Sequence, residues 1–134
     1  MALLGYTIPE TKEKVRDGSK RQTIRKLRKR PIKVGERLYH YWHLRQKDCE
    51  KLRESICKKT FFISLLIDRD GFWEIRQFNS HPSQASQSYR LNGDEIWELA
   101  KKDCFESSTG MVETLRRMHK IVADSRTFFQ VISW

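Results

Sequence analysis

Residues 60–78 read T-F-F-I-S-L-L-I-D-R-D-G-F-W-E-I-R-Q-F, and they contain the clearest structural pattern in the chain. Two runs rich in aromatic and branched residues, 60–68 and 72–78, have the composition of β-strands. Between them D-R-D-G at 68–71 combines residues that favour tight turns. The stretch therefore predicts a β-hairpin, and with it a fold built on antiparallel strands.

A further strand is predicted at residues 37–45, R-L-Y-H-Y-W-H-L-R. Alternation puts Leu38, His40, Trp42 and Leu44 on one face and Tyr39, Tyr41 and His43 on the other. Large side chains on both faces favour a closed barrel over an open sheet. The chain ends in T-F-F-Q-V-I-S-W, which has the composition of a last strand.

Helices are predicted on either side of these strands. Pro9 begins one that Gly18 ends, and Asn92-Gly93-Asp94 begins another that runs to about Lys102. Residues 107–109 cap a third, in which one face is lined by Met111, Leu115, Met118 and Ile121. Residues 20–26 are read as a strand or extended segment and residues 79–90 as a long polar loop. We therefore expect an α+β fold, a small, mostly antiparallel β-barrel flanked by short helices, in a single domain of residues 1–134.

The positive charge of the chain is concentrated in its first half. The formal net charge is +10, yet residues 1–60 hold 18 Lys and Arg against 7 Asp and Glu, while residues 61–134 hold 9 against 10. A local excess of this kind predicts a one-sided basic surface that faces a polyanion. The alternative is that the charge serves solubility alone.

Composition also bounds the setting of the protein. No apolar run approaches the roughly 20 residues of a membrane helix, and the N-terminus M-A-L-L-G-Y-T-I-P lacks the features of a signal peptide. The three cysteines are Cys49, Cys57 and Cys104. These features predict a reduced cytoplasmic protein without disulfides or membrane contact.

One motif resembles a known family. Residues Gly18-Ser19-Lys20-Arg21-Gln22-Thr23-Ile24-Arg25 fit the pattern G-x-K-x-x-x-x-R, which resembles the signature of the ASCH family of small, PUA-like β-barrels. Other stretches agree in order: V-G-E-R-L at 34–38, Y-W-H-L-R-Q-K-D-C-E-K-L at 41–52, L-A-K-K-D-C-F at 99–105 and the terminal F-F-Q-V-I-S-W. The second of these resembles phage-type and archaeal-type members. Cys104 stands where glycine is common in the family.

The resemblance implies a protein that binds RNA or a nucleotide. The ligand-binding residues that it and the local charge suggest are Gly18, Lys20, Arg21, Arg25, Lys26, Arg28, Tyr41 and Arg45. Arg25 offers a planar fork suited to phosphate or a base edge, and the run that continues to Arg30 would extend a cationic rim. A third reading is an interaction module whose basic face docks an acidic protein, and the sequence identifies no such partner.

The resemblance also implies a possible enzyme. One branch of the family hydrolyses N4-acetylcytidine with a lysine, a threonine three positions later and a carboxylate, which here correspond to Lys20, Thr23 and Asp103, with Glu106 as the second choice for the carboxylate. A ribonuclease-like activity is a further alternative. A lysine can activate a threonine hydroxyl if neighbouring cations lower its pKa, and Arg21 is such a neighbour.

Strand alternation works against this catalytic reading. If residues 20–25 are all extended, Lys20 and Thr23 point to opposite faces. Each of the three residues also has an ordinary structural explanation, as a phosphate contact, a strand threonine and a surface acid.

No cofactor or metal site is predicted from the sequence. The spacing of His40, His43, Cys49 and Cys57 fits no standard zinc motif, and the chain has no Gly-rich phosphate loop.

Overall fold

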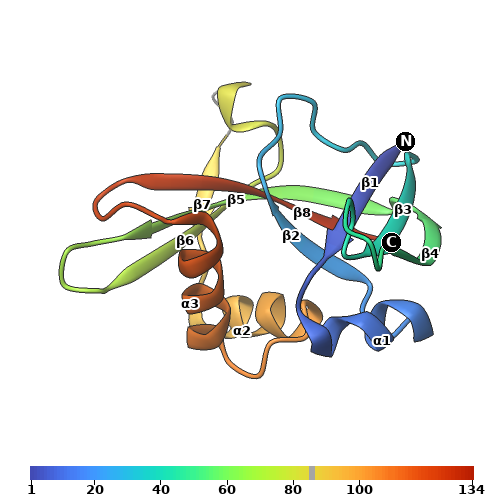
Figure 1. Cartoon of the computed structure of the whole chain (residues 1–134). Coiled ribbons are helices and arrows are strands. Elements are labelled where there is room, and N and C mark those ends of the chain that lie inside the picture. The colour runs from blue at the N-terminus through green and yellow to red at the C-terminus, as the bar shows by residue number, and fades with distance from the viewer. Residues whose placement is uncertain (85–86) are drawn as a thin grey trace. The chain divides into compact units, whose positions relative to one another are not determined.

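A computed structural model of the chain describes residues 1–84 and 87–134, and in these residues it shows an α+β fold of eight strands and three α-helices (Figure 1). The prediction of an α+β fold is confirmed. In chain order the elements are β1 (Ala2–Tyr6), α1 (Pro9–Asp17), β2 (Gln22–Lys26), β3 (Arg37–Trp42), β4 (Glu50–Ile56), β5 (Lys59–Ile67), β6 (Trp73–Phe78), the 3-10 turn η1 (Pro82–Gln84), β7 (Ser88–Arg90), α2 (Gly93–Lys102), α3 (Ser108–His119) and β8 (Arg126–Ser133).

The chain forms two compact units. The first unit comprises Met1–Gln22, Ile32–Thr60 and Ile132–Trp134, and the second unit comprises Thr23–Pro31 and Phe61–Val131. Two compact units can belong to one domain, so the expected single domain stays a prediction.

The first unit is built on a three-stranded sheet in the order β1-β3-β4. Strand β1 runs parallel to β3, and β4 runs antiparallel to β3 with an irregularity between His40 and Tyr41. Helix α1 has proline at its start and ends at Gly18, whose φ of +87° is the left-handed conformation that glycine adopts readily. Both predicted ends of this helix are confirmed. Its buried Val15 joins a core that includes Leu4 and Leu38.

The second unit is built on a five-stranded sheet in the order β2-β8-β5-β6-β7. The predicted hairpin is confirmed, because β5 and β6 pair antiparallel out to Ile67 and Trp73. Asp68 holds the turn: its carboxylate accepts hydrogen bonds from the backbone N–H groups of Asp70 and Phe72, both at 2.9 Å.

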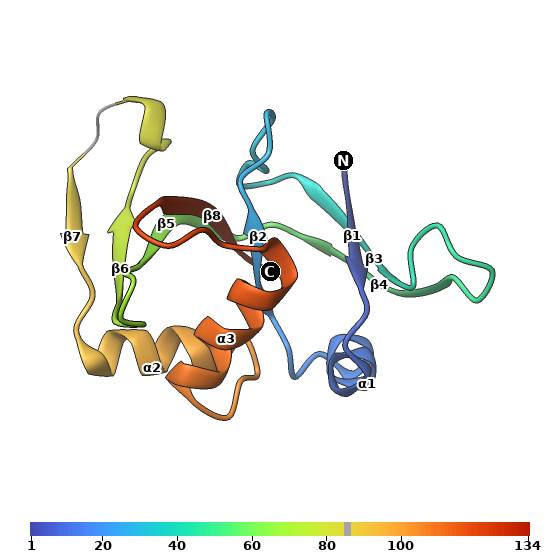
Figure 2. The same ribbon diagram turned by 60° about the vertical axis from the view of Figure 1, so that its left-hand side comes forward.

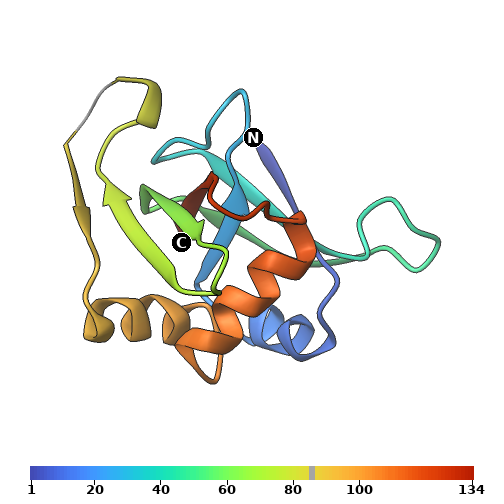
Figure 3. The same ribbon diagram turned by 90° about the vertical axis from the view of Figure 1, so that its left-hand side faces the viewer.

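Helices α2 and α3 lie together along one side of the strands of the second unit (Figures 2 and 3). Asn92 caps α2 through a reciprocal pair of hydrogen bonds with Glu95, and Ser107 caps α3 through the N–H of Gly110. Their apolar faces enter one core with strand residues; the core includes Ile24, Ile63, Leu65, Ile75, Leu99, Met111, Leu115 and Phe129.

Several sequence predictions need correction. Strands β1 and β4 were not expected, and the predicted strand 37–45 ends at Trp42, since His43 and Arg45 have positive φ values of 46° and 70°. Met118, placed on the buried face of α3, is 52% exposed. The predicted loop 79–90 contains η1 and the strand β7, which pairs with β6; its residues 85–86 lie outside the described residues.

The expected barrel is not what the strand pairings show. Among the described strands they give two sheets, and neither closes on itself. The tyrosines on the second face of β3 are only half-buried, and the Lys51 ammonium lies 5.5 Å from the ring centroid of Tyr39. Long cationic side chains can cover such a face, so two rich faces do not require a barrel. Among the described residues, no helix combines the length and apolar character needed to cross a bilayer.

Candidate functional site

The predicted site residues belong to both compact units. The first unit holds Gly18, Lys20, Arg21, Tyr41 and Arg45, and the second unit holds Thr23, Arg25, Lys26, Arg28 and Asp103.

In the first unit, two arginines meet the turn at Gly18. The Arg21 Nε donates a hydrogen bond of 3.0 Å to the Gly18 carbonyl. A Cβ at Gly18 would stand 2.6 Å from Nη1 of Arg53, so the guanidinium of Arg53 lies against this glycine. Asp17 accepts hydrogen bonds from the hydroxyl and the N–H of Ser19, and these bonds lower the pKa of Asp17. Arg53 was not identified from the sequence, because β4 was not.

Lys20 is 3% exposed, which is rare for a lysine. Its backbone N–H donates a 2.9 Å hydrogen bond to the carbonyl of Lys14, so the chain folds back on α1 just before β2 begins at Gln22. Because Lys20 precedes the strand, alternation along β2 does not set the direction of its side chain. The alternation argument, which sets Lys20 and Thr23 on opposite faces, therefore applies to β2 only from Gln22 onward.

In the second unit, Thr23 and Arg25 lie side by side on β2. Thr23 is 4% exposed, and its Oγ1 accepts a hydrogen bond of 3.0 Å from the Nε of Arg25. The two residues therefore share one face of the strand, as residues two apart in a strand do. The backbone N–H of Leu27 donates to the carbonyl of Phe128 at 3.1 Å, so pairing with β8 continues past the end of β2.

His119, the last residue of α3, is a candidate ligand-binding residue that the sequence did not reveal. Its ring packs edge-on against Phe129 of β8, with centroids 5.2 Å apart. Burial, and then the positive charges of Lys26 and Arg25, lower the pKa of His119. Lys26 and Arg25 are thus close enough to act on this imidazole. No local sequence pattern could have indicated His119, because its contact with Phe129 forms only when α3 packs against the sheet.

Asp103 ends α2 and is 8% exposed, whereas Glu106 is exposed. The N–H of Asp103 donates to the carbonyls of Leu99 and Ala100 at 3.3 and 3.2 Å. Cys104 follows with a φ of +66°, a conformation that glycine adopts most easily. A positive φ gives a physical reason why glycine would suit the position of Cys104.

The described residues include seven buried polar or charged side chains. Among these seven, Lys20 and Asp103 are the two with side chains that are ordinarily ionised at neutral pH. Burying such groups is unfavourable unless they are compensated by partners, so their burial calls for a specific reason. The seven are Lys20, Gln22, Thr23, His40, Ser64, Asp103 and Gln130.

Tyr41 and Arg45 are separated by a change in backbone direction. Tyr41 is half-buried on β3, opposite Lys51 of β4. Arg45 is exposed in the segment 43–49, which projects away from β3 and β4 in Figure 2. Within the described residues no hydrogen bond joins the two side chains.

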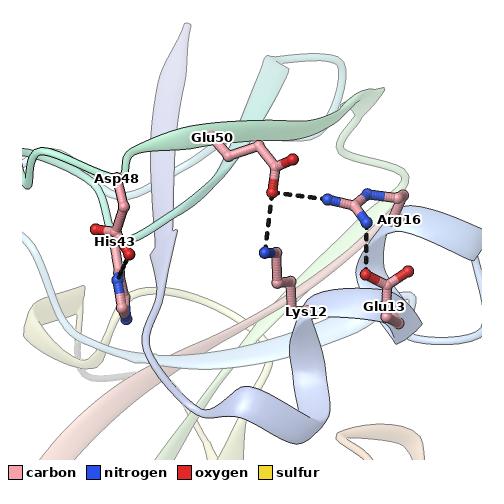
Figure 4. Close-up of polar contacts among 6 residues, drawn as sticks. All are labelled: Lys12, Glu13, Arg16, His43, Asp48 and Glu50. Carbon is pink, nitrogen blue, oxygen red and sulfur yellow. Dashed lines mark hydrogen bonds and ion pairs between the residues drawn. The ribbon is translucent and has the colours of Figure 1, made fainter.

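In the first unit, several positively charged side chains form ion pairs with acids (Figure 4). Lys12 and Arg16 both bind the carboxylate of Glu50, at 3.1 and 2.7 Å, and Arg16 also binds Glu13. His43 lies 2.7 Å from the Asp48 carboxylate. Lys12 and Arg16 lower the pKa of Glu50, chiefly through the hydrogen bond from Lys12.

The segment after Thr23 has a different charge balance. Residues 25–30 carry five Lys and Arg and no acid. In the described part of the chain, no ion pair involves Lys26, Lys29 or Arg30, and all three side chains are exposed. A concentrated field of positive charge therefore remains on the second unit.

The structure places the residues of the rejected zinc pattern in other roles. Both ring nitrogens of the buried His40 are engaged, Nδ1 with the Tyr6 hydroxyl at 2.8 Å and Nε2 with the Ser55 hydroxyl at 2.7 Å. Among the described residues, no group of three or more His, Cys, Asp or Glu side chains is arranged to hold a metal ion.

Comparison of the chain with protein-family models, with curated proteins and with solved structures finds no match.

Proposed function

We propose that this protein binds single-stranded RNA or a nucleotide fragment through the cationic segment 25–30, as an ASCH-type, PUA-like domain. The observation that carries the proposal is the run of exposed, uncompensated Lys26, Lys29 and Arg30 on the second unit. The family assignment rests on the G-x-K-x-x-x-x-R motif at residues 18–25.

Nucleic acid fits this surface better than a folded acidic protein does. Cations that follow one another along the chain can neutralise successive phosphates, and binding gains free energy by releasing counterions. Arg25 adds a guanidinium that is held in place by Thr23 and can form a fork to phosphate. An RNA strand needs no shape complementarity beyond such a track.

Binding can be tested by fluorescence anisotropy with labelled oligouridine at several salt concentrations. We expect retention at low salt and release at high salt, with a loss of affinity when Lys26 and Arg28 are both changed to Gln. No binding at any salt concentration would overturn the proposal. Tighter binding of a polyaspartate peptide of equal length would assign the surface to an acidic protein instead.

A second candidate function is hydrolysis of the amide of an N4-acylated cytidine. The observation that favours it is that Lys20, Thr23 and Asp103 are all among the seven buried polar side chains. The Thr23 hydroxyl would attack the acyl carbon and pass its proton to a base, for which Lys20 is the candidate. The C–N bond would then break, with the cytidine amine leaving in protonated form, and water would hydrolyse the acyl-threonine. Arg25 donates to Thr23 Oγ1 and would stabilise negative charge there.

Turnover of N4-acetylcytidine by the purified protein tests this candidate. Cytidine release that disappears in Lys20→Ala and Asp103→Asn would support it. Glu98→Gln serves as a control, because Glu98 is an exposed acid on the same helix as Asp103 and is paired with Lys101 at 2.8 Å. Equal loss in the control would point to a general effect of removing acid from α2. No release by the wild-type protein, free or within RNA, would overturn the enzyme reading and leave the binding proposal standing.

A further inference from the structure

Two elements of the second unit bring cationic groups together at the end of β2. Lys26 is the last residue of β2, and His119 is the last residue of α3. His119 packs on Phe129, while the neighbouring Phe128 accepts the hydrogen bond from Leu27. The imidazole is thereby held on β8 beside the point where β2 ends.

The groups that act on His119 from β2 are both permanent cations. Lys26 and Arg25 oppose its protonation, as burial against Phe129 does. On α3 itself, Arg116 lies 3.9 Å from Glu113, so its charge is partly offset, and Arg117 and Lys120 are exposed. A neutral imidazole next to two fixed positive charges is the form favoured at neutral pH.

We propose that Lys26 and His119 form a phosphate-binding cluster for single-stranded RNA, in which His119 takes up a proton as the phosphate binds. This inference rests on the proposed RNA-binding function and adds a specific contact and a pH response to it.

The proton uptake follows from the change in local charge. A phosphodiester is always ionised near neutral pH, so its arrival replaces a repulsive environment at His119 with an attractive one. The imidazolium then becomes the favoured form and donates from the ring to a phosphate oxygen. Because the complex holds one more proton than the free protein, linkage requires the affinity to rise as the pH falls.

The test is the affinity of the full chain for labelled oligouridine between pH 8 and pH 5.5 at constant ionic strength. Uridine does not titrate in this range, so the probe keeps its charge. We expect the wild type to gain affinity toward low pH, with a limit of about tenfold if binding raises the pKa of His119 by about one unit. His119→Gln should show no such gain.

His81→Gln is the matched control, since His81 also lies in the second unit but packs on Phe62 and bonds to Ser83. It should retain the wild-type response to pH. A gain that persists in His119→Gln, or a wild-type affinity that does not change with pH, would overturn the cluster while leaving the RNA-binding function intact. Failure to bind oligouridine at any pH would overturn both.

A second measurement does not depend on the stability of a variant. The titration of His119 can be followed by NMR in the free wild-type protein and in its complex with oligouridine. We expect a higher pKa in the complex, and an unchanged pKa would contradict proton uptake at this residue.

Discussion

The turn at Gly18 combines a backbone requirement with a side-chain requirement. Its φ of +87° favours glycine over every other residue, and the Arg53 guanidinium occupies the space where a Cβ would stand. Arg21 binds the carbonyl of the same residue. The glycine of the motif therefore lets the chain turn from α1 toward β2 and also lets an arginine of β4 approach the backbone.

Gly18→Ala is expected to destabilise the protein by about 1–2 kcal/mol, because an alanine must adopt a left-handed conformation there. Urea unfolding measures the change. Gly35→Ala is the matched control: its φ is +90°, yet nothing lies within 4 Å of the added Cβ. The end of the Arg53 side chain can move aside, so we expect similar losses in both variants. A much larger loss for Gly18→Ala would mean that Arg53 is fixed in place.

At the scale of elements, the sequence predicted what local chemistry determines. The hairpin 60–78 was predicted because its turn and both strands lie in one stretch, and α1 because proline and glycine mark its ends. Strand β4, E-K-L-R-E-S-I, was missed because it is mostly charged and buries one leucine; pairing with β3 makes it a strand. Tertiary pairing overrode its weak propensity.

The residues of the candidate site likewise divide into those that local sequence indicates and those that only packing brings together. Lys20, Thr23 and Arg25 could be named from a short motif, and the contact between Thr23 and Arg25 follows from alternation along one strand. His119 could not be named, because its place beside Phe129 depends on packing between residues distant in sequence. A motif therefore indicates residues on one element, and the groups that complete a site from another element need the fold.

Asn92 offers a test of how much one helix end contributes. It accepts a hydrogen bond of 2.9 Å from the N–H of Glu95, and the Glu95 carboxylate accepts one of 3.0 Å from the N–H of Asn92. Asn92→Ala should lower the free energy of unfolding by about 1 kcal/mol, as loss of a helix cap does. Asn92→Asp should lose little, since aspartate caps equally well. Equal losses in the two variants, measured in urea, would show that the cap is not what the substitution removes.

At the scale of the whole molecule, the positions of the cations matter more for phosphate binding than the net charge does. The formal charge of +10 is distributed over both units, but cations of α1 are held by Glu13 and Glu50, whereas Lys29 and Arg30 have no acid in their segment. A phosphate meeting Arg16 must compete with a carboxylate already 2.7 Å away. Among the described residues Lys26, Lys29 and Arg30 take part in no ion pair, so a phosphate meets these three cations without such competition.

Removing two positive charges either from the segment 25–30 or from α1 distinguishes a local RNA-binding track from a general attraction of RNA to a positively charged protein. For single-stranded nucleic acid, the logarithm of the affinity falls with the logarithm of salt concentration by about 0.7 for each phosphate neutralised. Lys29→Gln with Arg30→Gln should therefore make this slope shallower by about 1.4, the contribution of two phosphates. Lys12→Gln with Arg16→Gln removes the same charge from groups that already bind Glu50, and should leave the slope as in the wild type. Oligouridine affinity at a series of salt concentrations measures both slopes. If the two double variants change the slope equally, RNA responds to the net charge of the molecule, and the segment 25–30 is not its track.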